Sequence, residues 1–157
     1  MKNLTISIIA LFILATAGAF ATVRTVSNNA GTKAQYTSLQ AAIDAAVTGD
    51  TIYVHATINN YGDVTVTGKA LVIMGAGYNR PDGVNAGINI ITLNMANNTK
   101  IQNLKFTYIT GSNSDSIVIN NCYCSNTGVN CINIVGNNWN LYNNIFNLYH
   151  NGNGWFI

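Results

Sequence analysis

Charged side chains are scarce in this sequence. Only 8% of the 157 residues are charged, whereas ordinary globular domains carry about 25%. Glutamate is absent, so all five acidic residues are aspartates. The net charge of +2, with no cluster of basic residues, excludes a typical nucleic-acid-binding surface. Because 48% of the residues are hydrophobic, the composition also excludes intrinsic disorder, and the length fits a single domain.

Asparagine takes the place of charge as the source of polarity. The sequence contains 26 Asn, and 21 of them lie at or after Asn79. Asn-rich, prion-like chains have a similar composition, but they lack the regular spacing of apolar residues that this sequence has. The single proline, Pro81, stands in a loop-like segment, so proline interrupts few of the apolar runs.

The N-terminus has the layout of a secretory signal peptide. Lys2 precedes an apolar run over 4–17, and Ala19-Phe20-Ala21 places small residues where a signal peptidase cleaves. The run is short for a transmembrane helix, although an N-terminal anchor or a buried helix is the alternative. We therefore expect a secreted protein (extracellular, periplasmic or on a bacterial cell surface) without a membrane span after cleavage. The expected division is a signal peptide over 1–21, a strand and capping helix over 22–50, and coils over 51–157.

Three cysteines are an odd number for an exported chain. Cys122 and Cys124 alternate as in a strand and face one side, and Cys131 follows seven residues later. Zinc requires four ligands, and the nearest histidine is remote, so no metal site is expected. Buried thiols are the default expectation, one disulfide is the alternative, and the sequence does not identify a bonded pair.

A single amphipathic helix is predicted over 37–48. Thr37 and Gln40 form a capping-box pattern, in which each side chain satisfies a free backbone donor. Apolar residues recur at helical spacing from Leu39 to Val47, and Gly49 supplies the C-terminal stop. No later segment has a helical pattern.

The rest of the chain consists of short β-prone runs separated by Asn, Gly and Ser. Runs of three to six residues bury little by themselves and become stable when many stack along one axis. These runs cover 52–54, 64–66, 71–73, 88–93, 117–119 and 132–135.

Three of the later segments share the pattern apolar-x-Asn-x-x-apolar, beginning at Ile101, Ile119 and Leu141. The spacings of 18 and 22 residues suit a solenoid in which each coil contains two or three short strands. Asn tolerates the left-handed backbone of a sharp bend, and its amide can bond to an Asn one coil away. The pattern predicts three columns of stacked residues: Ile101, Ile119 and Leu141; Phe106, Cys124 and Phe146; and Asn103, Asn121 and Asn143.

The segment 36–52, YTSLQAAIDAAVTGDTI, resembles the opening of right-handed parallel β-helix proteins of the pectate-lyase-like superfamily. In those proteins an amphipathic helix caps the solenoid, and a Gly-Asp-Thr-Ile turn enters the first coil. The segment 71–78 resembles their second coil, and the whole resemblance covers about 23–147. It is most similar to secreted bacterial members of unassigned function.

The predicted fold is therefore an all-β, right-handed, single-stranded parallel β-helix of about five coils with an N-terminal capping helix. A cap is needed because an open strand edge invites association. No such cap follows the last repeat, where the chain has the apolar sequence Trp155-Phe156-Ile157. We expect a truncated or uncapped C-terminal end, with end-to-end or larger-chain association there as a candidate interaction.

Catalysis is not expected. Enzymes of the resembled superfamily bind Ca²⁺ through clustered carboxylates, or hydrolyse glycosides with two or three Asp on neighbouring coils. The aspartates of this chain are scattered, and no Asp, Glu, Lys or Arg follows Asp115. No cofactor, metal or catalytic residue is assigned.

A secreted, non-catalytic module that binds polysaccharide or another glycan is the first functional hypothesis, with Tyr123, Trp139 and Tyr142 as candidate glycan contacts. Two alternatives stay open. One is the N-terminal part of a polysaccharide lyase or glycoside hydrolase whose active coils lie beyond residue 157. The other is a structural spacer of a larger surface protein.

Overall fold

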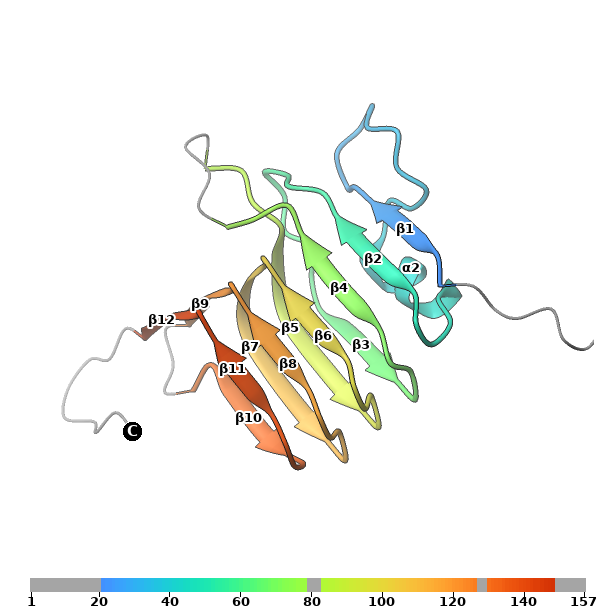
Figure 1. Cartoon of the computed structure of the whole chain (residues 1–157). Coiled ribbons are helices and arrows are strands. Elements are labelled where there is room, and N and C mark those ends of the chain that lie inside the picture. Colours follow the sequence, from blue (N-terminus) through green and yellow to red (C-terminus); the bar gives the residue numbers. More distant parts are fainter. Residues whose placement is uncertain (1–20, 79–82, 127–129, 149–157) are drawn as a thin grey trace, which may run out of the picture.

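The computed structural model describes residues 21–78, 83–126 and 130–148. It confirms the predicted fold class, because short parallel strands stack into a β-solenoid of about four turns with one short helix near the N-terminus (Figure 1). The prediction of about five coils is slightly too high. The predicted signal peptide, apart from Ala21, and the apolar residues 155–157 lie outside the described residues.

Two parallel sheets form the walls of the solenoid. The strands within each sheet are parallel to one another, and in Figure 1 the two sheets run in opposite directions, with helix α2 (Leu39–Ala45) beside the N-terminal strands. The first sheet consists, in spatial order, of β1 (Val23–Val26), β2 (Thr51–Val54), β4 (Val72–Gly75), β6 (Lys100–Gln102), β8 (Val118–Asn120) and β11 (Asn140–Tyr142). The second consists of β3 (Val64–Thr67), β5 (Gly87–Asn94), β7 (Lys105–Ser112), β9 (Tyr123–Asn126) and β12 (Ile145–Leu148), and β10 (Ile132–Val135) pairs with the second half of β7.

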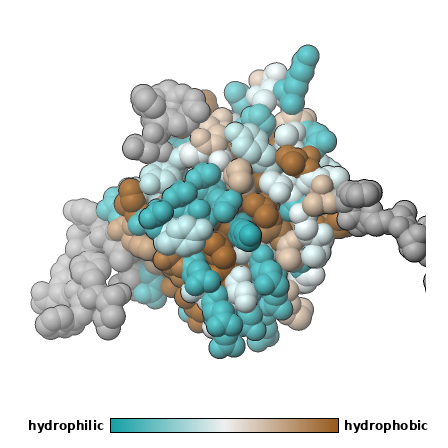
Figure 2. All heavy atoms as spheres, in the orientation of Figure 1, coloured by the Kyte–Doolittle hydropathy of each residue, from teal (hydrophilic) through white to brown (hydrophobic). Residues whose placement is uncertain are grey.

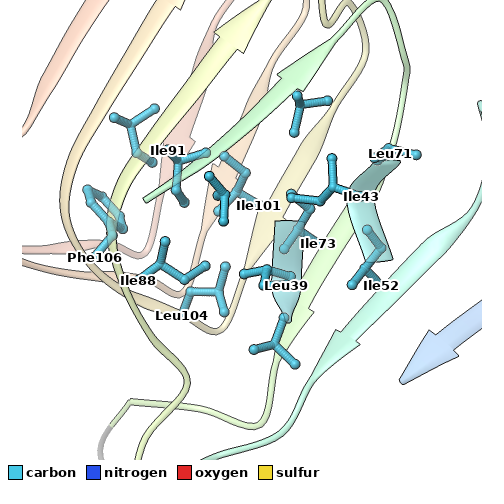
Figure 3. Close-up of a cluster of buried hydrophobic side chains, with 14 of the residues drawn as sticks. Leu39, Ile43, Ile52, Leu71, Ile73, Ile88, Ile91, Ile101, Leu104 and Phe106 are labelled. Carbon is cyan, nitrogen blue, oxygen red and sulfur yellow. The ribbon is translucent and has the colours of Figure 1, made fainter. Parts of the chain in front are cut away.

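The interior of the first sheet is a column of aliphatic side chains. The register aligns Ile101 with Ile119, and Ile119 with Leu141, as the repeat predicts. The column continues upstream, where Ile52 pairs with Ile73 and Ile73 with Ile101. Stacking equivalent residues removes each side chain from water on two sides, and this burial drives the association of strands too short to be stable alone. Figure 3 shows Ile52, Ile73 and Ile101 within the buried cluster.

A second interior column runs through the other sheet. Phe106 lies opposite Cys124, and Cys124 lies opposite Phe146. Ile88 extends this column upstream by pairing with Phe106 (Figure 3). Phe106 and Cys124 are buried, whereas Phe146 belongs to the last described strand and stays partly open to solvent.

The predicted asparagines occupy the corners between the two sheets. Asn103, Asn121 and Asn143 have φ angles of 55°, 53° and 54°, the left-handed region that asparagine tolerates. In the part of the chain that the structure describes, no hydrogen bond joins their three side-chain amides. Their predicted role as turn formers holds, while the expected amide-to-amide bonds are not formed.

The side chain that links coils at this corner belongs to the next residue, Asn144. Its amide nitrogen donates to the carbonyl oxygen of Ile119 at 2.8 Å, and its oxygen accepts from the backbone N–H of Cys122 at 3.0 Å. Asn144 directly follows the left-handed residue Asn143, and its side chain bonds to the backbone of the preceding coil.

Helix α2 (Leu39–Ala45) covers the N-terminal end and buries Leu39, Ala42 and Ile43. It is shorter than the predicted 37–48, and its N-cap is Ser38 rather than Thr37, because the Ser38 hydroxyl accepts from the N–H of Ala41 at 3.3 Å. The capping box predicted a hydrogen bond from the side chain of Gln40 back to the N-cap backbone, and this bond is not formed. The Gln40 amide instead bonds to the backbone of Thr65 in β3.

The helix ends before Gly49, so this glycine is not its stop. The C-cap is Ala46, in an extended conformation. Gly49, with φ of 96°, lies in the following turn, where the N–H of Asp50 donates to the carbonyl of Val47 at 3.1 Å. The left-handed conformation expected for Gly49 is present, but it serves the turn into β2.

Asp50 is a buried structural carboxylate at the start of the first coil. Its side chain has no solvent exposure and forms an ion pair with Arg24 at 2.9 Å. The N–H groups of Thr22 and Val47 donate to it at 2.8 and 3.1 Å. The Thr22 bond is the largest cause, and together with the Val47 and Arg24 bonds it holds the pKa of Asp50 well below its usual range.

The cysteines divide into one disulfide and one thiol. Cys124 and Cys131 are bonded, which corrects the default expectation of three free thiols. Cys122 is free and buried, as that default predicted, and burial raises the pKa of its thiol to about 11. The bond joins β9 to the start of β10 and closes a short loop at the C-terminal end of the solenoid.

Candidate functional site

Three of the described aspartates have structural partners, and Asp63 is exposed. Asp44 accepts from Gln40 within the helix, Asp50 is paired with Arg24, and the Oδ1 of Asp115 accepts from the backbone N–H of Asn137. Within 21–78, 83–126 and 130–148, no three His, Cys, Asp or Glu side chains gather as a metal site would require.

Two tyrosines instead meet on the outer surface of the second sheet. Tyr123 begins β9, and Tyr78 lies in the loop after β4. Their rings stack with centroids 5.6 Å apart and an angle of 22° between the planes. The hydroxyl of Tyr123 accepts from the side-chain amide of Asn147 at 2.9 Å. A candidate glycan contact from the sequence thus lies in a fixed aromatic pair.

Lys105 connects this aromatic pair to a polar cavity. Its ammonium lies 6.0 Å from the centroid of the Tyr123 ring, at the outer limit of a cation–π contact. Lys105 is directly opposite Tyr123 in the register of β7 and β9, which places both side chains on the outer face. The same lysine lines a cavity of about 170 Å³ together with Thr57, Ile58, Asn59, Asn60, Asn85 and Gly87.

The walls of this cavity are held in place by hydrogen bonds. The N–H of Thr57 donates to the carbonyl of Asn85 at 3.1 Å, which ties the two sides together. The side chain of Asn28 donates to the carbonyls of Asn59 and Asn60 at 3.3 and 3.1 Å. The Thr57 hydroxyl donates to the Asn28 amide oxygen at 2.7 Å. Such fixed polar groups lower the entropy cost of binding a ligand.

The cavity and the tyrosine pair bring together amide groups, aromatic rings and an ammonium group. Amide groups donate to and accept from sugar hydroxyls, aromatic rings pack against the apolar faces of sugars, and an ammonium attracts a carboxylate. The lining of the cavity is mostly uncharged and polar, with Lys105 as its cation. We call Tyr78, Tyr123, Lys105, Asn60 and Asn85 the tyrosine–lysine site.

The other two candidate glycan contacts lie elsewhere. Trp139 packs against the core, and its indole N–H donates to the carbonyl of Ser114 at 2.7 Å. Tyr142 is exposed on β11, where it lies opposite Asn120 in the first sheet. The structure therefore does not bring Trp139 or Tyr142 together with Tyr123, and neither belongs to the tyrosine–lysine site.

Comparison with known proteins adds no relative. No protein-family model, no curated protein and no solved structure matches the chain. Among the described residues no helix is long and apolar enough to cross a membrane.

Sequence reasoning counted Tyr78 among the aromatic residues but did not single it out, and it missed Lys105 and the asparagines of the cavity. The register that places Lys105 beside Tyr123 joins positions 18 residues apart, the same spacing as that between Ile101 and Ile119. Extending the repeat to its outward-facing positions would have found Lys105. Tyr78 and Asn60 come from loops of irregular length, for which the repeat has no signal.

Proposed function

We propose that the protein is a secreted, non-catalytic β-helix module that binds carbohydrate and is related to the pectate-lyase-like superfamily. The observation that carries the proposal is the junction at Lys105, where a stacked tyrosine pair adjoins a cavity lined by amide side chains. An aromatic surface, amides and one cation together favour a polysaccharide that carries carboxylates.

Export is supported by two independent features. The N-terminal segment has the charge, apolar run and small-residue site of a signal peptide. Cys124 and Cys131 form a disulfide, a bond that persists chiefly in oxidising compartments outside the cytosol. The resemblance of 36–52 to the opening of the pectate-lyase-like superfamily supports the relationship to that group.

The test is a binding titration with polygalacturonate, a carboxylated polysaccharide, and with an uncharged glucan. We expect binding to the carboxylated polymer, with roughly a tenfold loss in Lys105→Gln, which corresponds to about 1.4 kcal/mol. Tyr78→Ala is expected to weaken binding by a similar factor. Lys100→Gln is the matched control, because Lys100 is exposed on the other sheet and its loss changes the net charge equally.

Equal losses in Lys105→Gln and Lys100→Gln would reject the site in favour of general charge attraction. No binding to either polymer would reject the function and leave the structural spacer. Cleavage of polygalacturonate in the presence of Ca²⁺ would contradict the non-catalytic assignment and favour the lyase.

A further inference from the structure

Two amide side chains border the same small space above Gly87, in the cavity of the tyrosine–lysine site. A Cβ on Gly87 would lie 3.0 Å from the Oδ1 of Asn85 and 3.3 Å from the Nδ2 of Asn60. Because residue 87 has no side chain, this space stays open, and Gly87 lines the cavity together with both asparagines. One amide oxygen and one amide nitrogen thus lie beside the same opening.

Hydrogen bonds fix which end of each amide borders the opening. The Oδ1 of Asn60 accepts from the N–H of Gly62 at 2.7 Å, and the Nδ2 of Asn85 donates to the carbonyl of Gly83 at 3.2 Å. The other end of each amide, the Nδ2 of Asn60 and the Oδ1 of Asn85, has no hydrogen-bond partner among the described residues. One unused donor and one unused acceptor therefore remain beside Gly87.

Backbone hydrogen bonds hold the loop of Asn60 against the strand of Gly87. The N–H of Tyr61 donates to the carbonyl of Gly87 at 2.9 Å, and the N–H of Asn89 donates to the carbonyl of Gly62 at 3.0 Å. The two amides are thus positioned before any ligand arrives. Polar groups that are fixed in advance cost less entropy when a ligand binds.

A sugar hydroxyl has the groups that this pair of amides lacks. A hydroxyl can donate its hydrogen to the Oδ1 of Asn85 while its lone pairs accept from the Nδ2 of Asn60. An ester or ether oxygen has no hydrogen to donate, so it would leave the Asn85 oxygen unpaired. An ionised carboxylate accepts only, and its oxygens would lie against that same oxygen. The pair of amides therefore favours a free hydroxyl.

The register places a cation and an aromatic ring next to this point. Gly87 lies directly opposite Lys105, and Lys105 lies opposite Tyr123. Neighbouring strands are about 4.8 Å apart, so the hydroxyl contact, the cation and the ring follow one another along the solenoid axis. Among the described residues no carboxylate pairs with Lys105, since the ion pair there joins Arg24 and Asp50. Lys105 is therefore available to a carboxylate of the ligand.

We propose that the cavity recognises a free ring hydroxyl of a uronic acid unit whose carboxylate binds Lys105. Asn60 donates to this hydroxyl, Asn85 accepts from it, and Gly87 keeps the space for it open. The inference rests on the proposed carbohydrate binding and narrows its ligand class. The preferred polymers carry carboxylates and have ring hydroxyls free of acetyl and methyl groups.

The test compares the binding of polygalacturonate with that of the same polymer O-acetylated on its ring hydroxyls, which keeps every carboxylate. The unaltered protein is expected to bind the acetylated polymer about tenfold more weakly or worse, because a site that hydrogen-bonds a hydroxyl rejects an analogue without it. Gly87→Ala places a methyl group in the opening. It is expected to weaken the binding of polygalacturonate and to remove the preference between the two polymers.

A second variant and two controls separate this role from a general effect on folding or charge. Asn85→Ala removes the acceptor and is also expected to remove the preference, whereas Asn94→Ala, an amide of β5 outside the cavity lining, is expected to keep it. Lys100→Gln is expected to keep it too. Lys100 belongs to the first sheet, in front in Figure 1, where Figure 2 shows hydrophilic (teal) and hydrophobic (brown) residues side by side.

The outcomes distinguish this inference from the proposed function. Equal binding of the two polymers by the unaltered protein would overturn the inference, as would an unchanged preference in both Gly87→Ala and Asn85→Ala. The proposed function would still stand in either case if Lys105→Gln weakens the binding of polygalacturonate. No binding of either polymer to the unaltered protein would reject the proposed function, and the inference with it.

Discussion

Asparagine provides most of the left-handed backbone that the corners of the solenoid require among non-glycine residues. Of the eight described non-glycine residues with positive φ, six are asparagines: Asn98, Asn103, Asn113, Asn121, Asn138 and Asn143. The left-handed conformation costs most residues roughly 1–2 kcal/mol, and asparagine tolerates it better than other residues that carry a Cβ. The corners that recur from coil to coil thus account for part of the abundance of asparagine.

Asp50 is the acidic residue on which the stability of the N-terminal end depends. We expect Asp50→Ala to lower the free energy of unfolding by about 1–3 kcal/mol, because Arg24 and the N–H groups of Thr22 and Val47 lose their acceptor. Urea denaturation measures the change. Asp63→Ala removes an exposed carboxylate and is expected to change the free energy of unfolding by less than about 0.5 kcal/mol.

The same residue makes stability depend on pH. The pKa of Asp50 is lower in the folded protein than the value of about 3.9 in an unfolded chain. The unfolded chain therefore binds the proton more readily, and stability falls as pH falls from about 5 through the lowered pKa. Above pH 5 the contribution is complete. Urea titrations between pH 2 and 6 are expected to show a smaller decline for Asp50→Ala, and an equal decline would refute the assignment.

At the residue scale, the sequence predicts the repeating positions and misses most of those that occur once. The columns of Ile101 and Phe106 follow from the repeat, because each position recurs with the same environment in the next coil. Lys105 also recurs in register, but its partner cavity is built from loops. The Cys124–Cys131 bond depends on how a short loop is closed, which spacing alone does not determine.

At the scale of single elements, Trp139 completes the core at the C-terminal end. Asn140 pairs with Val118, so Trp139 occupies the position of the buried Ile117 one coil earlier. Its indole packs against Gly111 in β7, where a Cβ would overlap the ring. A larger side chain at 139 thus fits only because position 111 is glycine.

Gly111→Ala tests this pairing of glycine and tryptophan. We expect a loss of stability of about 1–3 kcal/mol from overpacking, together with a red shift of tryptophan emission as the Trp139 indole moves toward water. Gly87→Ala is the matched control, because a Cβ there meets only the ends of the Asn85 and Asn60 side chains at 3.0 and 3.3 Å. An unchanged emission maximum in Gly111→Ala would show that Trp139 is not held by this contact.

The capping helix shows why an element is easier to predict than its boundaries. The apolar stripe from Leu39 to Ile43 is buried as its spacing predicts. Its ends depend on competing local bonds. Ser38 takes the cap from Thr37, and Gln40 bonds to β3, a partner that is 25 residues away in the sequence. The predicted capping box is wrong because the glutamine side chain bonds to the backbone of β3 and not to the N-cap.

At the scale of the whole molecule, a solenoid is stabilised by contacts between neighbouring coils, so stability is expected to vary along its axis. The interior side chains of β4 to β7 are covered by a coil on each side, whereas those of β11 and β12 are covered on one side. We therefore expect amide hydrogen exchange to be slowest in β4 to β7 and fastest in β11 and β12. Uniform protection in all coils would contradict this and indicate a single cooperative unit.

Two conservative variants make this final prediction quantitative. Ile119→Val and Ile52→Val each remove one buried methylene from the same interior column and are expected to cost about 0.5–1.5 kcal/mol. Because coils interact mainly with their neighbours, Ile119→Val is expected to speed exchange in β8 to β12 and to leave β2 unchanged. Ile52→Val is expected to act on β1, β2 and β4 instead. If both variants speed amide exchange equally in every coil, the coils unfold together and the prediction is wrong.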